Sequence, residues 1–141
     1  MSMKIVLAAA LTAGLAAVAA PARAHHSFAA EYDSTKSVTL KGTVTKMEWA
    51  NPHIYFFIDV KDEAGRVTNW AVEGGAPNGL YRNGWRKDSV KIGDVVTVQG
   101  FLARDGAPLA NMRSVVLADG RRVLGGQQDG GPDAAQPGGN R

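Results

Sequence analysis

The chain has 141 residues, no cysteine and a formal net charge of +3 at pH 7. This length fits a single domain. The lack of cysteine excludes a disulfide framework, a cysteine-ligated zinc or iron–sulfur site and a thiol nucleophile. The excess of basic over acidic residues is compatible with nucleic acid or an anionic membrane as a partner, if the basic residues lie in the folded part of the chain.

The first 24 residues have the pattern of a secretory signal peptide. Residues 5–20 are an unbroken run of small and apolar residues, with Lys4 before it and Ala22-Arg23-Ala24 after it. The run is shorter than the roughly 20 residues of a membrane-spanning helix. We therefore expect export to the periplasm by the general secretory route, with cleavage after Ala24 or after Ala22. The mature chain is then not an integral membrane protein.

Most of the basic excess belongs to this leader. Residues 1–24 hold two of the sixteen Lys and Arg residues and none of the thirteen acidic residues, so fourteen basic and thirteen acidic residues remain, a net charge of +1. Phosphate binding needs clustered cations. Arg82, Arg86 and Lys87 form a local cluster, but such a cluster is typical of a solvated face. The sequence thus predicts no nucleic-acid partner.

The two ends of the mature chain differ from its middle. Residues 125–141 are rich in Gly and Pro and have no aromatic or β-branched residue. They bury too little apolar surface to offset the entropy of ordering, which predicts a disordered tail. Residues 25–30 are predicted to be an N-terminal arm and residues 31–124 the folded domain.

The first predicted strand is long and bent. Between Ser37 and Trp49, apolar and polar residues alternate with period two, as expected for a strand with one solvated face. The phase of the alternation flips near Thr45–Lys46, which predicts a β-bulge there.

Further strands follow at regular intervals and predict an all-β fold. Ala76–Val90 interrupts them with Pro77 and helical spacing of apolar residues, indicating one short helix. Three strands, a short helix and two or three more strands is the element order of the OB-fold. We expect a small OB-fold-like barrel of five to six strands with a helix between strands 3 and 4; an open β-sandwich is the alternative. The later strands are expected at His53–Lys61, Arg66–Glu73, Val95–Ala103, Met112–Ala118 and Arg121–Leu124.

Several short motifs also carry a family resemblance. They are His25-His26-Ser27-Phe28, Val44-Thr45-Lys46, Trp49-x-Asn51-Pro52-His53, Trp70-x-Val72-Glu73-Gly74, Tyr81-x-x-Gly84-Trp85 and Gly93-Asp94. In these motifs the chain resembles a family of small exported bacterial proteins of unknown function with an OB-fold-like domain and an N-terminal His-His arm. The resemblance covers about residues 25–123 and implies fold and export, without an activity.

The three histidines are the candidate metal ligands. If His25 is the first mature residue, its α-amino group and its imidazole chelate one ion, and His53 is a third nitrogen donor. Such a nitrogen set suits copper(II). Cleavage after Ala22 places His25 third, where the amine, two amides and the imidazole also bind copper(II). Zinc held by His25, His26 and His53 is a variant, and an inert arm with His53 capping a turn is the structural alternative.

A second set of candidates is aromatic and lies on the predicted strands and loops. Aromatic residues on an OB-like surface form stacking platforms for ligands, whereas inside the barrel they pack the core. The loops around Asn51–His53 and Glu73–Asn78 are the other candidate binding segments. The candidate ligand-binding residues are therefore the aromatic Trp49, Trp70, Tyr81 and Trp85, together with Asn51 and Glu73.

Two functional hypotheses follow. The first is a non-catalytic periplasmic binding protein that takes an unknown small ligand or a periplasmic protein. The second is a copper-handling protein with His25 and His53 as ligands, of which a copper-dependent oxidase or oxygenase would be an extension. Neither a Gly-x-Ser-x-Gly elbow nor a His-Glu-x-x-His motif is present, so we do not expect an enzyme.

Overall fold

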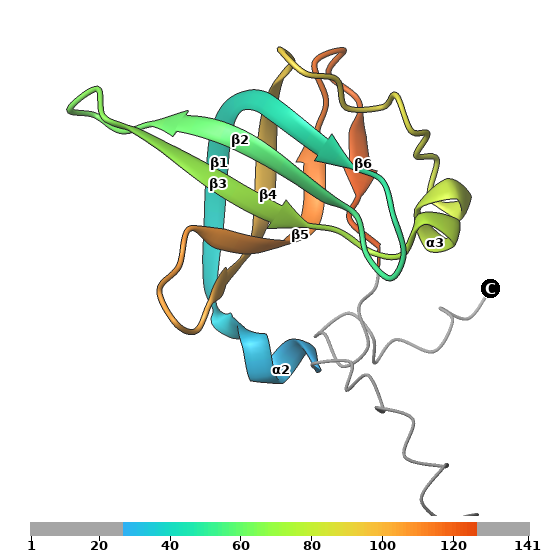
Figure 1. The fold of residues 1–141 in the computed structure, drawn as a ribbon, viewed down its shortest axis with the longest axis horizontal. Helices are drawn as coiled ribbons and strands as arrows, with labels where there is room; N and C mark the ends of the chain where they lie inside the picture. The colour runs from blue at the N-terminus through green and yellow to red at the C-terminus, as the bar shows by residue number, and fades with distance from the viewer. Residues whose placement is uncertain (1–26, 127–141) are drawn as a thin grey trace, which may run out of the picture.

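The computed structural model describes residues 27–126 as a mostly β protein (Figure 1). One six-stranded sheet has the order β3-β2-β1-β4-β5-β6, and two short helices accompany it. The predicted leader, the histidines His25 and His26, and residues 127–141 of the predicted tail lie outside the described residues. The strands are β1 (Tyr32–Glu48), β2 (Tyr55–Lys61), β3 (Val67–Glu73), β4 (Val95–Ala103), β5 (Leu109–Val116) and β6 (Arg122–Leu124).

The sheet folds back on itself. Neighbouring strands pair antiparallel, and β3 also pairs with β5 in parallel, with Glu73 opposite Asn111. Five strands are therefore joined in a ring of pairings that runs from β3 through β2, β1 and β4 to β5 and returns to β3. This agrees with the predicted all-β class.

The strand β1 pairs with β2 along its second half and with β4 along its first half. Its register shifts between Val44 and Lys46, which confirms the bulge that the change of phase predicted. Gly42 lies where a Cβ atom would come within 2.6 Å of the Asp59 carbonyl oxygen, so only glycine allows the two strands to approach this closely.

One hydrophobic core lies inside the folded sheet. Alternate residues of β2 and β3, such as Phe56, Ile58 and Val72, are fully buried in it. The helix α3 (Pro77–Arg82) follows β3 and starts with Pro77 in its first turn, as expected for the predicted short helix. Leu80 of α3 and the nearby Trp85 are completely buried in the same core.

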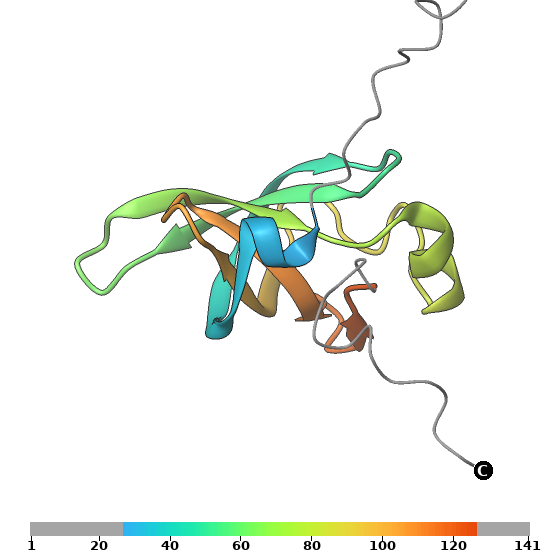
Figure 2. The same cartoon turned by 90° about the horizontal axis from the view of Figure 1, so that it is seen from below.

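A smaller apolar cluster lies on the other side of the sheet. The helix α2 (Phe28–Glu31) lies against one end of the sheet, close to the β4–β5 connection (Figures 1 and 2). Phe28 packs its ring on Tyr32 and Phe101, with centroids 5.5 and 5.7 Å away. The burial of Phe28 holds part of the predicted arm against the sheet as a helix. The sequence did not predict this helix, because four residues are too few to show a helical period.

Candidate functional site

The most unusual group in the described structure is a buried carboxyl group on the outer side of the sheet. Glu73 is the last residue of β3 and only 3% exposed. The residues that pair with Glu73 on the neighbouring strands determine which side chains surround it. Tyr55 on β2 and Asn111 on β5 are its partners in register, so all three side chains leave the sheet on the same side.

Two residues from other segments contact the Glu73 carboxyl group. The Tyr32 hydroxyl, at the start of β1, donates a hydrogen bond to Oε2. His53, in the β1–β2 connection, has its Nδ1 2.6 Å from Oε1. A carboxylate only accepts hydrogen bonds, so Nδ1 of His53 carries the hydrogen and Nε2 is the other ring nitrogen. The His53 side chain is 25% exposed, whereas that of Glu73 is 4% exposed.

The environment of Glu73 also affects both tyrosines. Burial raises the pKa of the Tyr32 phenol, and the hydrogen bond to Glu73 raises it further. Burial is also the main cause that raises the pKa of Tyr55. The negative charge of Glu73 and a hydrogen bond to Glu73 raise it further. Both phenols therefore stay protonated at pH values well above the usual pKa of tyrosine, and both act as hydrogen-bond donors to the buried carboxylate.

Asn111 adds an unusual feature beside this cluster. It is 6% exposed, and its amide nitrogen Nδ2 has no hydrogen-bond partner within residues 27–126. A buried donor without an acceptor costs about 1–3 kcal/mol, so native proteins rarely keep one without a reason. We call Tyr32, His53, Tyr55, Glu73 and Asn111 the Glu73 cluster.

The structure separates the sequence-predicted ligand-binding residues into different environments. Trp49 packs its ring on Tyr81 and Trp85, with centroids 5.4 and 6.5 Å away. Trp85 is fully buried and donates its indole hydrogen to the Leu124 carbonyl oxygen, with the heavy atoms 2.7 Å apart. Trp70 is partly buried against the same core.

The other predicted residues have separate places. Asn51 is exposed in the β1–β2 connection, and Glu73 belongs to the Glu73 cluster. His53 also belongs to this cluster, whereas His25 and His26 lie outside the described residues. Within residues 27–126, no group of three or more His, Cys, Asp or Glu side chains is arranged to hold a metal ion.

Sequence reasoning missed three members of the Glu73 cluster, namely Tyr32, Tyr55 and Asn111. Tyr32 lies before the alternating pattern that marked the first strand, and Tyr55 belongs to an almost continuous apolar run. The one available signal was Glu73 itself, a charged residue at the end of a strand that is apolar on its other face.

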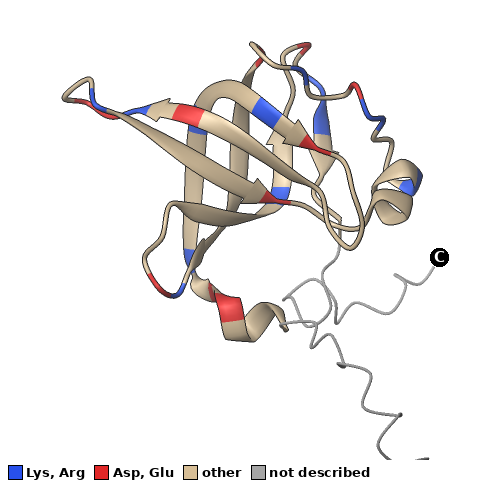
Figure 3. Cartoon of the chain, in the orientation of Figure 1, with Lys and Arg blue, Asp and Glu red and all other residues tan. Residues whose placement is uncertain are grey.

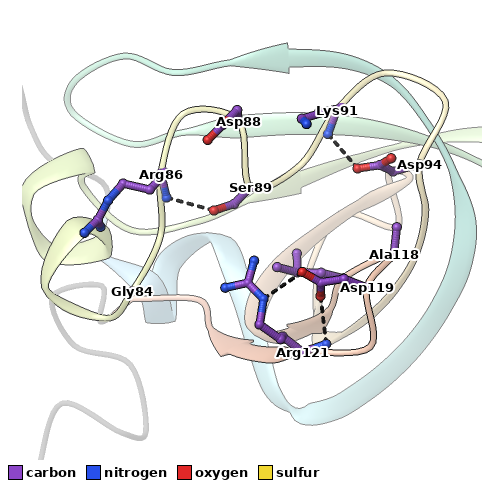
Figure 4. A pocket seen from close by; sticks show the side chains of 10 residues that line it. Gly84, Arg86, Asp88, Ser89, Lys91, Asp94, Ala118, Asp119 and Arg121 are labelled. Carbon is purple, nitrogen blue, oxygen red and sulfur yellow. Dashed lines mark hydrogen bonds and ion pairs between the residues drawn. The ribbon is translucent and has the colours of Figure 1, made fainter.

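A polar depression lies between residues 84–94 and the turn that joins β5 to β6 (Figure 4). Its side chains bond mostly to neighbours in the same loop. The Ser89 hydroxyl accepts from the Arg86 amide at 2.8 Å, and Asp119 pairs with Arg121 at 2.7 Å. These local bonds explain the turns, and they leave this depression less distinctive than the Glu73 cluster.

Positively and negatively charged residues are interspersed over the described part of the chain. Lys and Arg are spread over several strands, loops and α3, with Asp and Glu between them (Figure 3). None of the helices within residues 27–126 has the length and apolar character that crossing a membrane requires.

Comparison with known families identifies the group to which the chain belongs. A family model described as "Family of unknown function (DUF6152)" matches residues 11–111, which is more than half of the chain. The chain belongs to the DUF6152 family. This agrees with the resemblance to a family of unknown function. No curated protein matches this DUF6152 protein. The match spans every member of the Glu73 cluster.

Proposed function

We propose that this protein is an exported, non-catalytic binding protein of the periplasm whose domain is an OB-fold-like barrel. The ring of pairings that returns from β5 to β3 supports the barrel, as does the position of α3 between β3 and β4. OB-folds bind ligands on the face of strands 2 and 3 and in the loops between strands 1 and 2 and between strands 4 and 5. This location is an analogy at the level of the fold.

The Glu73 cluster is the proposed binding site. His53 comes from the β1–β2 connection, and Tyr55 and Glu73 come from β2 and β3, which are the segments that the analogy indicates. The observation that carries the proposal is the unpartnered Nδ2 of Asn111 beside a buried carboxylate. A bound polar group that accepts from Asn111 would remove the cost of this unpaired donor.

The aromatic residues have a different role in this proposal. Trp85 fills the core and closes it beside β6, and Trp49 and Tyr81 pack over it. Tyr81 remains 38% exposed. We assign these rings to closing one end of the barrel and place ligand recognition at the Glu73 cluster.

Thermal unfolding of the exported protein tests the proposal. The protein is expressed with its own leader, recovered from the periplasmic fraction and scanned with copper(II) sulfate, zinc sulfate, glucose, glycine and a tripeptide. A ligand present at 100 times its Kd stabilises the native state by about 2.7 kcal/mol. We expect at least one probe to raise Tm in the native protein, and Glu73→Gln and Asn111→Leu to lose that shift.

Lys41→Ala is the matched control, because Lys41 is exposed on β1. It should retain the full shift of the native protein. The proposal is wrong if none of the five probes raises Tm, or if the shift persists unchanged in both cluster variants. Recovery of the chain in the cytoplasm with its leader attached would refute export.

A further inference from the structure

The outer side of β2 carries two aromatic side chains next to the buried carboxyl group. Phe56 and Ile58 on this strand point into the core and are fully buried. The alternate residues Tyr55 and Phe57 therefore leave β2 on the outer side, where both are only partly buried. We call Tyr55 and Phe57 the aromatic row. Because Tyr55 belongs to the Glu73 cluster, the row continues directly from the proposed binding site.

The neighbours of Phe57 leave its ring accessible to a ligand. Its partner in register on β3 is the small Ala71, which is paired in turn with Leu109 of β5. On the β1 side, the ammonium group of Lys46 lies 5.2 Å from the centroid of the Phe57 ring. The Lys46 side chain is 59% exposed. A flexible side chain with this exposure can move aside for a ligand that packs on the ring.

Polar side chains lie at the far end of the aromatic row. Asp59 follows Phe57 by two positions on β2, and Asn69 of β3 is its partner in register. The Asn69 amide donates to Oδ1 of Asp59 at 2.8 Å and to Oγ1 of Thr45 at 3.1 Å. From Tyr55 to Asp59 the strand rises by about 13 Å. This face thus has an aromatic centre with hydrogen-bonding groups at both ends, a composition typical of small-molecule sites.

The Glu73 cluster leaves one donor and one acceptor for a ligand. Nδ2 of Asn111 has no partner within residues 27–126 and needs an acceptor. Nδ1 of His53 donates to Glu73, so in the neutral ring Nε2 accepts a hydrogen bond. A hydroxyl group can serve both, because its oxygen accepts and its hydrogen donates. It is also small, which matters because Asn111 is only 6% exposed.

The charges around the site favour a neutral ligand. The Glu73 carboxylate is 3% exposed, so it repels an anion placed beside it. A cation would not accept a hydrogen bond from the Asn111 amide. The charge closest to the aromatic row is that of Lys46, and an ion pair with Glu48 neutralises it. The site therefore calls for an uncharged molecule with hydroxyl groups and a face that packs on an aromatic ring.

We infer that the proposed binding site takes a neutral carbohydrate, whose hydroxyl groups bond to Asn111 and His53 and whose ring packs on Phe57. The C–H groups of a sugar ring suit the face of an aromatic ring, which is the negative part of its charge distribution. OB-folds bind oligosaccharides on the corresponding face of strands 2 and 3. This inference rests on the proposed function and gives the ligand its chemical class.

Calorimetric titration of the exported protein with glucose, galactose, mannose, maltose and sucrose tests the inference. We expect at least one of these sugars to bind the native protein. Phe57→Leu keeps an apolar side chain at the centre of the face and removes the aromatic ring. It should weaken sugar binding by about tenfold or more, as the loss of a stacking partner does for nucleobases. Lys41→Ala is again the control and should bind like the native protein.

Asn111→Leu separates a role in binding from a role in folding. Leucine has a similar shape and removes the unpartnered donor. We expect the Tm of this variant without sugar to stay the same or to rise, because no buried donor is left without an acceptor. Its affinity for the sugar should fall by about tenfold or more. A lower Tm would mean that the Asn111 amide has a partner within the folded protein, and it would refute its role as a ligand donor.

Two results would overturn the carbohydrate site. One is that none of the five sugars binds. The other is sugar binding that is unchanged in either Phe57→Leu or Asn111→Leu. If the sugars fail but glycine or the tripeptide gives a Tm shift that depends on Glu73, the ligand class is wrong and the proposed binding function stands.

Discussion

Replacing Tyr32 with phenylalanine isolates the hydrogen bond at the centre of the Glu73 cluster. Tyr32 is 0% exposed and its ring packs on Phe28, so phenylalanine retains the packing and removes only the hydroxyl. The hydroxyl donates to a carboxyl group that is itself 3% exposed. A hydrogen bond to a charged group contributes about 1.5–3 kcal/mol. We expect Tyr32→Phe to lower the free energy of unfolding by that amount.

Urea unfolding followed by tryptophan fluorescence measures this loss, with linear extrapolation to water. In a domain of this size, each kcal/mol also lowers Tm by about 4–8 °C. The control is Tyr81→Phe, because Tyr81 is 38% exposed and such a change usually stays within about 0.5 kcal/mol. A loss for Tyr32→Phe no larger than for the control would refute the assignment of the hydrogen bond.

A double-mutant cycle sharpens the same test. Glu73→Gln should cost less in the Tyr32→Phe background than in the native protein, because the shared hydrogen bond has already gone. Residues in direct contact show interaction energies of about 0.5–3 kcal/mol. Additive losses within error would mean that the two side chains do not interact in solution.

Three further predictions concern stability. The raised pKa values of Tyr32 and Tyr55 mean that the folded state keeps two protons that the unfolded state releases above about pH 10. The free energy of unfolding should therefore fall there by about 1.4 kcal/mol per pH unit for each phenol. Urea unfolding midpoints between pH 8 and 11 measure this fall, and the same dependence of stability on pH in Tyr32→Phe as in the native protein would contradict it. Gly100→Ala should lower the free energy of unfolding by about 1–3 kcal/mol or more, because its Cβ would overlap a backbone carbonyl oxygen of β5. Gly79→Ala in α3 should instead raise it by up to about 1 kcal/mol. Equal effects of the two variants in thermal unfolding would contradict the close approach of β4 and β5 at Gly100. Trp85→Phe should cost about 1–3 kcal/mol in urea unfolding, because it removes the partly buried indole hydrogen bond to the Leu124 carbonyl oxygen. No loss of stability would mean that this bond does not contribute to the stable core.

The strand pattern of the fold was predictable because side chains on alternate positions face opposite sides of a sheet. The alternation in β1 and its change of phase at Thr45 indicated both the strand and its bulge, and the register of the structure confirms the bulge. The start of β1 at Tyr32 was not predictable in this way. Residues 33–36 are polar and lie mostly at the surface, so no period marks them as a strand.

The candidate site was only partly predictable. The sequence indicated His53 as a candidate metal ligand and Glu73 as a candidate ligand-binding residue, but not that the two side chains meet. Their contact depends on the loop after β1, whose path no local pattern specifies. Asn111 had no signal at all, because its significance comes from the pairing of β3 with β5, a parallel contact between strands distant in sequence.

The hydrogen bond from Tyr32 to Glu73 joins residues 41 positions apart. Contacts of long sequence separation form only after the intervening chain has been brought together, and they slow folding. Tyr32 therefore stays without its acceptor until β3 has reached the start of β1, and the Glu73 cluster closes only when both ends of the segment from β1 to β3 have come together.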